Sequence, residues 1–224
     1  MKFALSLIAL IIAALVLPFF LPVSGKQEGI DPNVNLPWQI DLDGQGGSRV
    51  FGVRPGLDTL AEVRAVLGGD AEVAIVAAPD EVGSLEAYYA QLPLGFVLAK
   101  VILTVDASPE LIVAMRDRAL KAEHMESTTR KIRLHPDDLI LAERLPVKAI
   151  SVIPTVNLDE ATVLQRFGPP GERLLVSEKR VHLLYPERGL DVVVDADGKE
   201  LLQYVAPRHF SLLREPLLKS SVGQ

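Results

Sequence analysis

The sequence predicts an α+β fold in which an N-terminal transmembrane helix precedes a mostly antiparallel sheet with packed helices. Three features lead to this prediction: an apolar run opens the chain, short capped helix patterns recur along it, and β-rich runs separated by turn residues fill its carboxyl-terminal part. Two of the helix patterns are similar to each other. Two related helix-plus-meander halves are therefore one interpretation of the chain, and chance similarity of two well-capped helices is the other.

Residues 1–25 are expected to form a transmembrane signal anchor. The stretch 3–23 is almost entirely apolar, and Lys2 is the only charged residue within the segment. A helix rises about 1.5 Å per residue, so about 20 residues cross the ~30 Å hydrocarbon core of a bilayer. The segment therefore predicts attachment to membrane lipid.

A cleavable signal peptide is the alternative for this segment. Val23-Ser24-Gly25 offers small residues before a cut, and Pro18 and Pro22 disfavour a continuous helix. The anchor is favoured because its apolar stretch is longer than the roughly 7–15 residues usual in a signal peptide. Both alternatives export the remainder. With the favoured anchor, the expected location is the cytoplasmic membrane, single-pass, with an extracytoplasmic (periplasmic) C-terminal domain.

The composition excludes several classes of protein. The chain carries a formal net charge of −6 and has no basic stripe with interleaved aromatic residues, so no nucleic acid is expected as a partner. It has no cysteine, which excludes disulfides, thiol catalysis, cysteine-ligated zinc and a lipidated cysteine. The roughly 200 residues after the anchor are enough for one large domain or two small ones.

Turn-rich stretches and the spacing of the helix patterns divide the chain into segments. Gly, Pro, Asn and Asp are frequent just after the anchor, and these residues favour turns and a solvated backbone. The expected segments are a transmembrane signal anchor (1–25), a juxtamembrane linker (26–56), an α+β subdomain (57–154), a helix-plus-β-meander subdomain (155–210) and a C-terminal tail (211–224).

Two segments offset by 100 residues, 57–69 and 157–169, are typical of short capped helices. Each should begin with a capping pair, Thr59 with Glu62 and Asn157 with Glu160. Each should end at a glycine with positive φ in the left-handed C′ position, Gly68 and Gly168. The residues expected to face inward are Leu60, Val63 and Leu67 in the first helix and Val163, Leu164 and Phe167 in the second.

The β-rich runs after the second helix predict an antiparallel meander. Its strands are expected at 171–178, 180–186, 190–196 and 201–207. The Asp197-Gly198 turn before the last of them is the most specific hairpin pattern.

The preceding part of the chain is less regular. Strands are predicted at 72–78, 97–105, 127–135 and 147–154, whereas 84–92 fits either a strand or a helix. One helix should begin after Ser108 and continue to about Lys121, and a shorter one should begin near Pro136. The residues expected on the inner side of the first are Leu111, Ile112, Met115, Ala119 and Leu120.

Residues 155–206 resemble the BamE-like (SmpA/OmlA) modules of small bacterial envelope proteins. The similarity depends on Leu158-Asp159-Glu160 leading the helix, Phe167-Gly168-Pro169-Pro170 ending it, a strand closing on Leu184-Tyr185-Pro186, and the segment 189–194 before the Asp197-Gly198 turn. It covers about a quarter of the chain, and the lipidated cysteine of that family is missing. The resemblance implies a non-enzymatic interaction module of the bacterial cell envelope.

Several residues invite a more specific interpretation. The stretches 41–44 and 195–198 have calcium-like spacing, but Gly52 and Ala206 stand where a twelfth-position carboxylate would be, so simple turns are favoured. Trp38 fits either the membrane interface or packing on the folded domain. The tyrosines that fit either a ligand groove or core packing are Tyr88, Tyr89 and Tyr185.

The sequence predicts no catalytic, cofactor-binding or metal-binding residue. His135 lies in a His-Pro-Asp-Asp context that suits a helix start, while His124, His182 and His209 are scattered. No nucleophile elbow, Walker or dinucleotide glycine motif occurs.

Three functional hypotheses remain. The leading one is a membrane-anchored extracytoplasmic binding or scaffold protein of the bacterial cell envelope, non-enzymatic and with an envelope protein as partner. A small-ligand or lipid-binding envelope domain is the alternative, and an enzyme is the third. An apolar groove would favour the second hypothesis, and a buried histidine–carboxylate pair in a cleft would favour the third.

Overall fold

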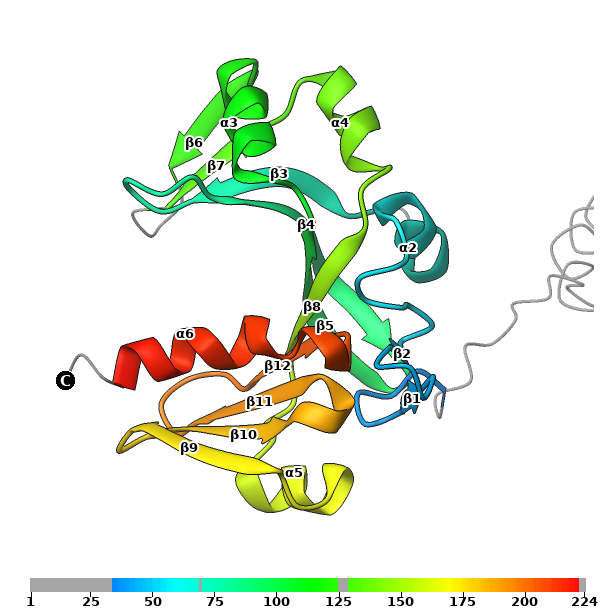
Figure 1. Ribbon diagram of the computed structural model, residues 1–224, viewed down its shortest axis with the longest axis vertical. Helices are drawn as coiled ribbons and strands as arrows, with labels where there is room; N and C mark the ends of the chain where they lie inside the picture. Colours follow the sequence, from blue (N-terminus) through cyan, green and yellow to red (C-terminus); the bar gives the residue numbers. More distant parts are fainter. Residues whose placement is uncertain (1–33, 69, 125–128, 222–224) are drawn as a thin grey trace, which may run out of the picture. The chain divides into compact units, whose positions relative to one another are not determined.

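The computed structural model describes residues 34–68, 70–124 and 129–221 of the chain (Figure 1). They belong to one compact unit, 32–224, and the predicted anchor at 1–25 lies outside the described residues. Within the described part, no helix is both long enough and apolar enough to cross a membrane. The fold is α+β with a large antiparallel sheet, which confirms the predicted class.

Ten strands of the described part form one sheet in the order β6-β7-β3-β4-β5-β8-β12-β11-β10-β9. Each pair of neighbours is antiparallel. The strands are β3 (Glu72–Ala77), β4 (Ser84–Leu94), β5 (Val97–Val105), β6 (Lys121–His124), β7 (Arg130–Arg133), β8 (Val147–Pro154), β9 (Glu172–Ser177), β10 (Arg180–Tyr185), β11 (Leu190–Asp195) and β12 (Leu201–Val205).

Helices and a small hairpin pack around this sheet. The helices are α2 (Leu60–Leu67), α3 (Pro109–Asp117), α4 (Pro136–Ala142), α5 (Glu160–Phe167) and α6 (Ser211–Ser221), with short 3-10 turns η1 (Pro186–Arg188) and η2 (Pro207–His209). Strands β1 (Ile40–Leu42) and β2 (Ser48–Val50) form the separate hairpin.

Side chains alternate between two faces of the sheet, and one of these carries the main hydrophobic core. We call it the core face. Helices α2 to α5 pack there through the buried residues Leu60, Val63, Ile112, Met115, Ala142, Val163 and Phe167. The strands contribute alternate residues, among them Ile75, Leu85, Leu103, Ile150, Leu202, Val192 and Leu183.

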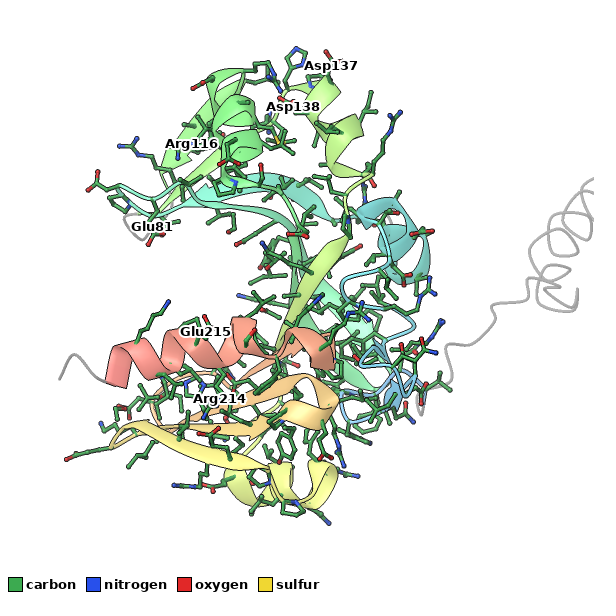
Figure 2. The ribbon with its side chains drawn as sticks, in the orientation of Figure 1. Glu81, Arg116, Asp137, Asp138, Arg214 and Glu215 are labelled. Atoms are coloured by element: carbon green, nitrogen blue, oxygen red, sulfur yellow. The ribbon has the colours of Figure 1, made fainter. Side chains whose placement is uncertain are left out.

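The opposite face, which we call the second face, is covered by α6 over strands β9 to β12. Figure 1 shows α5 and α6 on opposite sides of these strands. The contact is a small apolar cluster of its own, made of Leu184, Val205 and Phe210 with Ala149, Leu174, Leu213 and Leu217 around them. Arg214 of α6 also donates two hydrogen bonds to the carboxylate of Glu172 on β9, at 2.8 and 3.2 Å. In Figure 2, Arg214 and Glu215 lie on different sides of α6.

Most predicted elements are confirmed. The strand predicted at 97–105 and the strand predicted at 147–154 have those bounds, and all four strands of the predicted meander form. The segment 84–92, which fitted a strand or a helix, is part of β4. Pairing with β3 on one side and β5 on the other decides between the two.

The helix after Ser108 is shorter than predicted. It ends at Asp117, and Lys121 already begins β6. The backbone N–H of Leu120 donates to the carbonyl of Arg133 at 3.0 Å, which places this residue beside the next strand instead of on a helix. The expectation that Leu120 faces inward is therefore wrong, because its side chain is 59% exposed.

The predicted capping box of α2 is confirmed, but that of α5 is partly wrong. Thr59 accepts from the backbone N–H of Glu62, whose carboxylate accepts from the backbone N–H of Thr59. In α5 the cap is Asp159 and not Asn157, because the Asp159 carboxylate is the one that accepts from the backbone N–H of Thr162, at 2.8 Å. The helix thus begins later than expected.

One inward-facing residue predicted for α5 is also wrong. Val163 and Phe167 are buried on the core face, as predicted, but Leu164 is 39% exposed. A helix of eight residues presents only a narrow stripe to the sheet, and Leu164 lies beside that stripe.

Residues assigned to the linker and to the tail take part in the folded unit. Phe51, just after β2, is buried and its ring meets that of Tyr204 edge-on at 5.3 Å. The hydroxyl of Tyr204 donates to the carbonyl of Pro37 at 2.9 Å. At the other end, helix α6 occupies most of the segment 211–224.

The sheet can be divided between β8 and β12 into two halves that have the same strand order and matching registers. Strands β3, β4, β5 and β8 form what we call the N-terminal half-sheet, and β9, β10, β11 and β12 form the C-terminal half-sheet. Each half-sheet follows a helix, α2 or α5, and α3, β6, β7 and α4 are inserted between β5 and β8.

The pairing of residues matches between the half-sheets. The pair Ala74 and Glu86 on β3 and β4 has its counterpart in Leu174 and His182 on β9 and β10. The differences in residue number between these counterparts, from Ala74 to Leu174 and from Glu86 to His182, convert four consecutive β3–β4 pairs into β9–β10 pairs. In the same way, the pair Leu103 and Ile150 on β5 and β8 corresponds to the pair Val192 and Leu202 on β11 and β12.

Equivalent hydrogen bonds join the end of the helix to the sheet in the two halves. Tyr89 on β4 donates from its hydroxyl to the carbonyl of Gly68 at 2.8 Å, and Tyr185 on β10 donates to the carbonyl of Gly168 at 2.9 Å. Both glycines follow their helix with positive φ, 107° and 78°, as predicted, but their ψ angles of 157° and −171° are extended, so the predicted left-handed helical cap is wrong. Because this positive φ is combined with an extended ψ in both, the backbone region is one that only glycine populates readily.

Candidate binding groove on the second face

A groove opens on the second face of the N-terminal half-sheet. Its volume is about 480 Å³. Strands β3, β4, β5, β7 and β8 supply the lining together with Thr129, and the lining residues are Glu72, Ala74, Val76, Glu86, Tyr88, Lys100, Ile102, Thr129, Lys131 and Ile153. We call this surface the β3–β5 groove.

Strand alternation explains why these side chains share one surface. Within β3, Ala74 and Val76 point away from the core residue Ile75, and within β5, Ile102 points away from Leu103. The small side chain of Ala74 forms part of the floor, whereas Tyr88 and Ile102 are only partly buried. The groove is therefore an apolar floor that no helix of the described part lines.

Charged groups surround this floor. Lys131 pairs with Glu72 at 2.6 Å, and Lys100 is exposed at the rim. Glu86 lies on β4 and accepts a hydrogen bond from the Ser84 hydroxyl. Burial raises the pKa of Glu86, and the bond from Ser84 opposes that rise. A ligand that offers an apolar surface flanked by charges of both signs would match this arrangement.

A buried histidine–carboxylate pair lies elsewhere on the second face. The ring Nδ1 of His182 on β10 is 2.8 Å from a carboxylate oxygen of Asp191 on β11, and the two side chains are 8% and 1% exposed. Among the residues that the structure describes, the other oxygen, Asp191 Oδ1, has no hydrogen-bond partner. The pair is next to Leu184, which packs under α6, and neither residue lines the β3–β5 groove.

In the sequence His182 is an isolated histidine, and the structure brings it to Asp191. The spacing of the β10–β11 hairpin, with η1 between the strands, was the signal that could have found the pair. A histidine held by a carboxylate can act in catalysis when it also reaches a substrate. This one is buried in the sheet beside the α6 contact.

His135 lies where the sequence predicts, at the start of a helix. It caps α4, with Nδ1 accepting from the backbone N–H of Asp137 at 3.3 Å. The adjacent Asp138 is buried and is held by Arg118, whose Nη2 lies 2.6 Å from Asp138 Oδ1. Figure 2 shows Asp137 and Asp138 at this helix start.

The two calcium-like stretches are turns, as predicted. Asp43 accepts from the backbone N–H groups of Gln45 and Gly47, and Asp195 accepts from that of Asp197. Among residues 34–68, 70–124 and 129–221, no group of three or more His, Cys, Asp or Glu residues is placed to hold a metal ion.

The aromatic residues divide between the two predicted roles. Tyr88 lines the β3–β5 groove, whereas Tyr89 and Tyr185 belong to the core face. Trp38 packs against the folded domain, with its ring 5.9 Å from that of Phe96 and the Arg166 guanidinium 4.7 Å from its centre.

Comparisons of this chain with models of protein families, with curated proteins and with solved structures give no match.

Proposed function

We propose that this chain is a membrane-anchored extracytoplasmic binding protein of the bacterial cell envelope, non-enzymatic, with the β3–β5 groove as its binding site. The groove carries this proposal. It combines a continuous apolar floor with charged groups of both signs, and such concave surfaces are the usual sites of recognition.

The proposed location is supported by the sequence of residues 1–25. The apolar stretch 3–23 is long enough to cross a bilayer, and the folded unit that follows it would be exported. The resemblance of residues 155–206 to BamE-like modules agrees with an interaction role in the envelope.

We further propose that the two half-sheets descend from one helix-plus-meander module. The matching registers and the paired Tyr–Gly hydrogen bonds support common origin. Chance similarity of two helix caps would not bring the strand registers into agreement as well.

Site-specific photo-crosslinking in living cells tests the binding role. A benzophenone amino acid at Ile102, in the groove, is expected to give a discrete adduct with an envelope protein. The matched control is the same amino acid at Leu175, which lies on β9 and is 63% exposed. Equal labelling from both positions, or no protein adduct from Ile102, would contradict the proposal.

The alternative is a small apolar ligand or a lipid in the same groove. Its volume of about 480 Å³ favours this alternative, because it lies within the ~300–1,000 Å³ of known small-molecule sites. Under this alternative the adduct from Ile102 would have the mass of a lipid or metabolite added to the chain. The mass of the crosslinked species therefore separates the two functions.

A further inference from the structure

We propose that the β3–β5 groove receives an amphipathic helix of a partner protein, in the way that the C-terminal half-sheet receives α6. This inference rests on the proposed binding function and names the kind of partner. Its basis is the correspondence between the half-sheets, which relates the groove to a surface already occupied by a helix.

The matching registers place the groove on the counterpart of the α6 site. The three strand residues that α6 covers in the C-terminal half-sheet are Leu174, Leu184 and Val205. Their counterparts by register are Ala74, Tyr88 and Ile153. All three counterparts line the β3–β5 groove. The same backbone geometry is thus covered by a helix in one half, whereas in the other half no helix of the described residues covers it.

The charges agree with the same comparison. In the C-terminal half-sheet, Glu172 is held by Arg214 of α6 through two hydrogen bonds. The counterpart of Glu172 is Glu72, which lines the groove and is paired with Lys131. A basic residue on the incoming helix would join Lys131 around Glu72.

These contacts define the expected helix. Its apolar residues should be spaced like Phe210, Leu213 and Leu217, which face the sheet on one side of the α6 segment. A basic residue should stand at the place of Arg214. Recognition of an amphipathic helix by an apolar groove is a recurring mode of peptide binding. Here the pairing of the basic residue with Glu72 would set the direction of the helix.

A peptide of residues 207–221 is the probe, because it carries this pattern. The full-length chain is reconstituted in lipid nanodiscs, and binding is followed by fluorescence anisotropy of the labelled peptide. We expect saturable binding that Ile102→Arg weakens at least tenfold. The matched control Leu175→Arg should change the affinity less than twofold.

A second control separates the groove from the site that α6 already occupies. Leu174→Arg alters the α6 site, and it should leave peptide affinity within twofold of the parent chain. Loss of binding through Leu174→Arg, with Ile102→Arg harmless, would mean exchange with α6 and would overturn the inference.

A charge exchange gives an answer that does not depend on the apolar variants folding well. Glu72 is half exposed, so Glu72→Arg is expected to keep the fold and to weaken the peptide about fivefold or more. A peptide carrying Arg214→Glu should bind the Glu72→Arg chain with the affinity that the unchanged peptide has for the parent chain. An unchanged affinity in both combinations would overturn the predicted orientation and the inference with it.

The outcomes also distinguish this inference from the proposed function. If no saturable peptide binding occurs but Ile102 crosslinks to an envelope protein, the groove binds a partner that is not an α6-like helix, and only the inference fails. If Ile102 gives no protein adduct, the proposed function fails, and an adduct with the mass of a lipid or metabolite then supports its alternative. If a separate peptide of residues 1–33 displaces the labelled peptide from the groove, the occupant is the chain's own N-terminal segment. That result also overturns the inference.

Discussion

At the scale of single residues, buried side chains on the core face hold the helices to the sheet. Phe167 is the clearest case, because it is 2% exposed and its ring lies 6.0 Å from that of Tyr185. The hydroxyl of the same tyrosine reaches the carbonyl of Gly168, so packing and hydrogen bonding coincide at the end of α5.

Replacing Phe167 tests this contact. Phe167→Ala should lower the free energy of unfolding by about 3–5 kcal/mol, through lost burial and the cavity left behind. Leu164→Ala on the same helix is the control and should cost less than about 1 kcal/mol, because Leu164 is exposed. Chemical denaturation of both variants measures the difference. Similar costs would contradict the described packing of α5.

Glu86 allows a prediction about pH at a single residue. Burial raises its pKa, so the folded chain keeps the proton at pH values where the unfolded chain has lost it. Stability should therefore fall as pH rises from the ordinary pKa of 4.5 through the raised one. Glu86→Gln removes this fall, and Gln can still accept the Ser84 hydrogen bond.

The measurement is thermal unfolding of Glu86→Gln and of the parent chain at pH 4 and pH 7. The difference in thermal stability between the variant and the parent should favour the variant more at pH 7 than at pH 4. A relative gain at pH 4 instead would show that a charged Glu86 is stabilised in the folded chain.

At the scale of elements, caps and strand pairing decide where each segment begins and ends. The capping box of Thr59 and Glu62 determines the start of α2, and local sequence is enough to predict it. The choice of strand for 84–92 needs its two neighbours, because the sequence of this segment fits both periodicities.

The ion pair between α6 and β9 gives a prediction for this element. Hydrogen bonds from Arg214 lower the pKa of Glu172, so the pair stabilises the fold above the ordinary pKa of 4.5 and is lost as pH falls through the lowered pKa. Arg214→Met should destabilise the chain at pH 7, and the difference from the parent should shrink as pH falls below that range. Urea unfolding over pH 3–7 would check this. A difference that is constant with pH would show that the arginine acts through packing of its stem alone.

The two Tyr–Gly hydrogen bonds make a matched pair of elements. Tyr89→Phe and Tyr185→Phe each remove one hydroxyl and leave the ring, so each should cost about 0.5–1.5 kcal/mol. Denaturation of the two single variants measures both costs under one set of conditions. If one hydroxyl proved several times more important than the other, the halves would not be energetically equivalent, although their registers match.

At the scale of the whole molecule, one sheet unites segments that the sequence patterns divided. Strands β8 and β12 are neighbours, and they join the segment 57–154 to the segment 155–210 without a gap in the sheet. The second face is then covered by α6 in one half and carries the β3–β5 groove in the other.

The membrane topology is a prediction for the chain as a whole. Alkaline phosphatase fused after Gln224 should be active, because the folded unit is expected outside the cytoplasm. Removal of residues 1–25 is the control and should abolish the activity. A fluorescent cytoplasmic reporter that lights up at the same fusion point, with an inactive phosphatase, would contradict the predicted topology.

The sequence by itself determined most of the local structure. Runs of β-favouring residues marked β5, β8 and the four strands of the meander, and capping residues marked α2 and α4, because these patterns depend on neighbours within a few positions. It also indicated Gly68 and Gly168, whose helix ends need a positive φ.

The tertiary structure decided what depends on residues far apart in the chain. Three features show this: His182 meets Asp191, α6 covers Leu184, and Tyr88 is partly exposed in the groove. All three follow from which strands pair and which face the described helices leave uncovered. Local sequence favours a strand without specifying its neighbour, since register and partner are selected by burial over the whole sheet. For that reason the sequence predicted no site residue, and the β3–β5 groove emerged only from the assembled sheet.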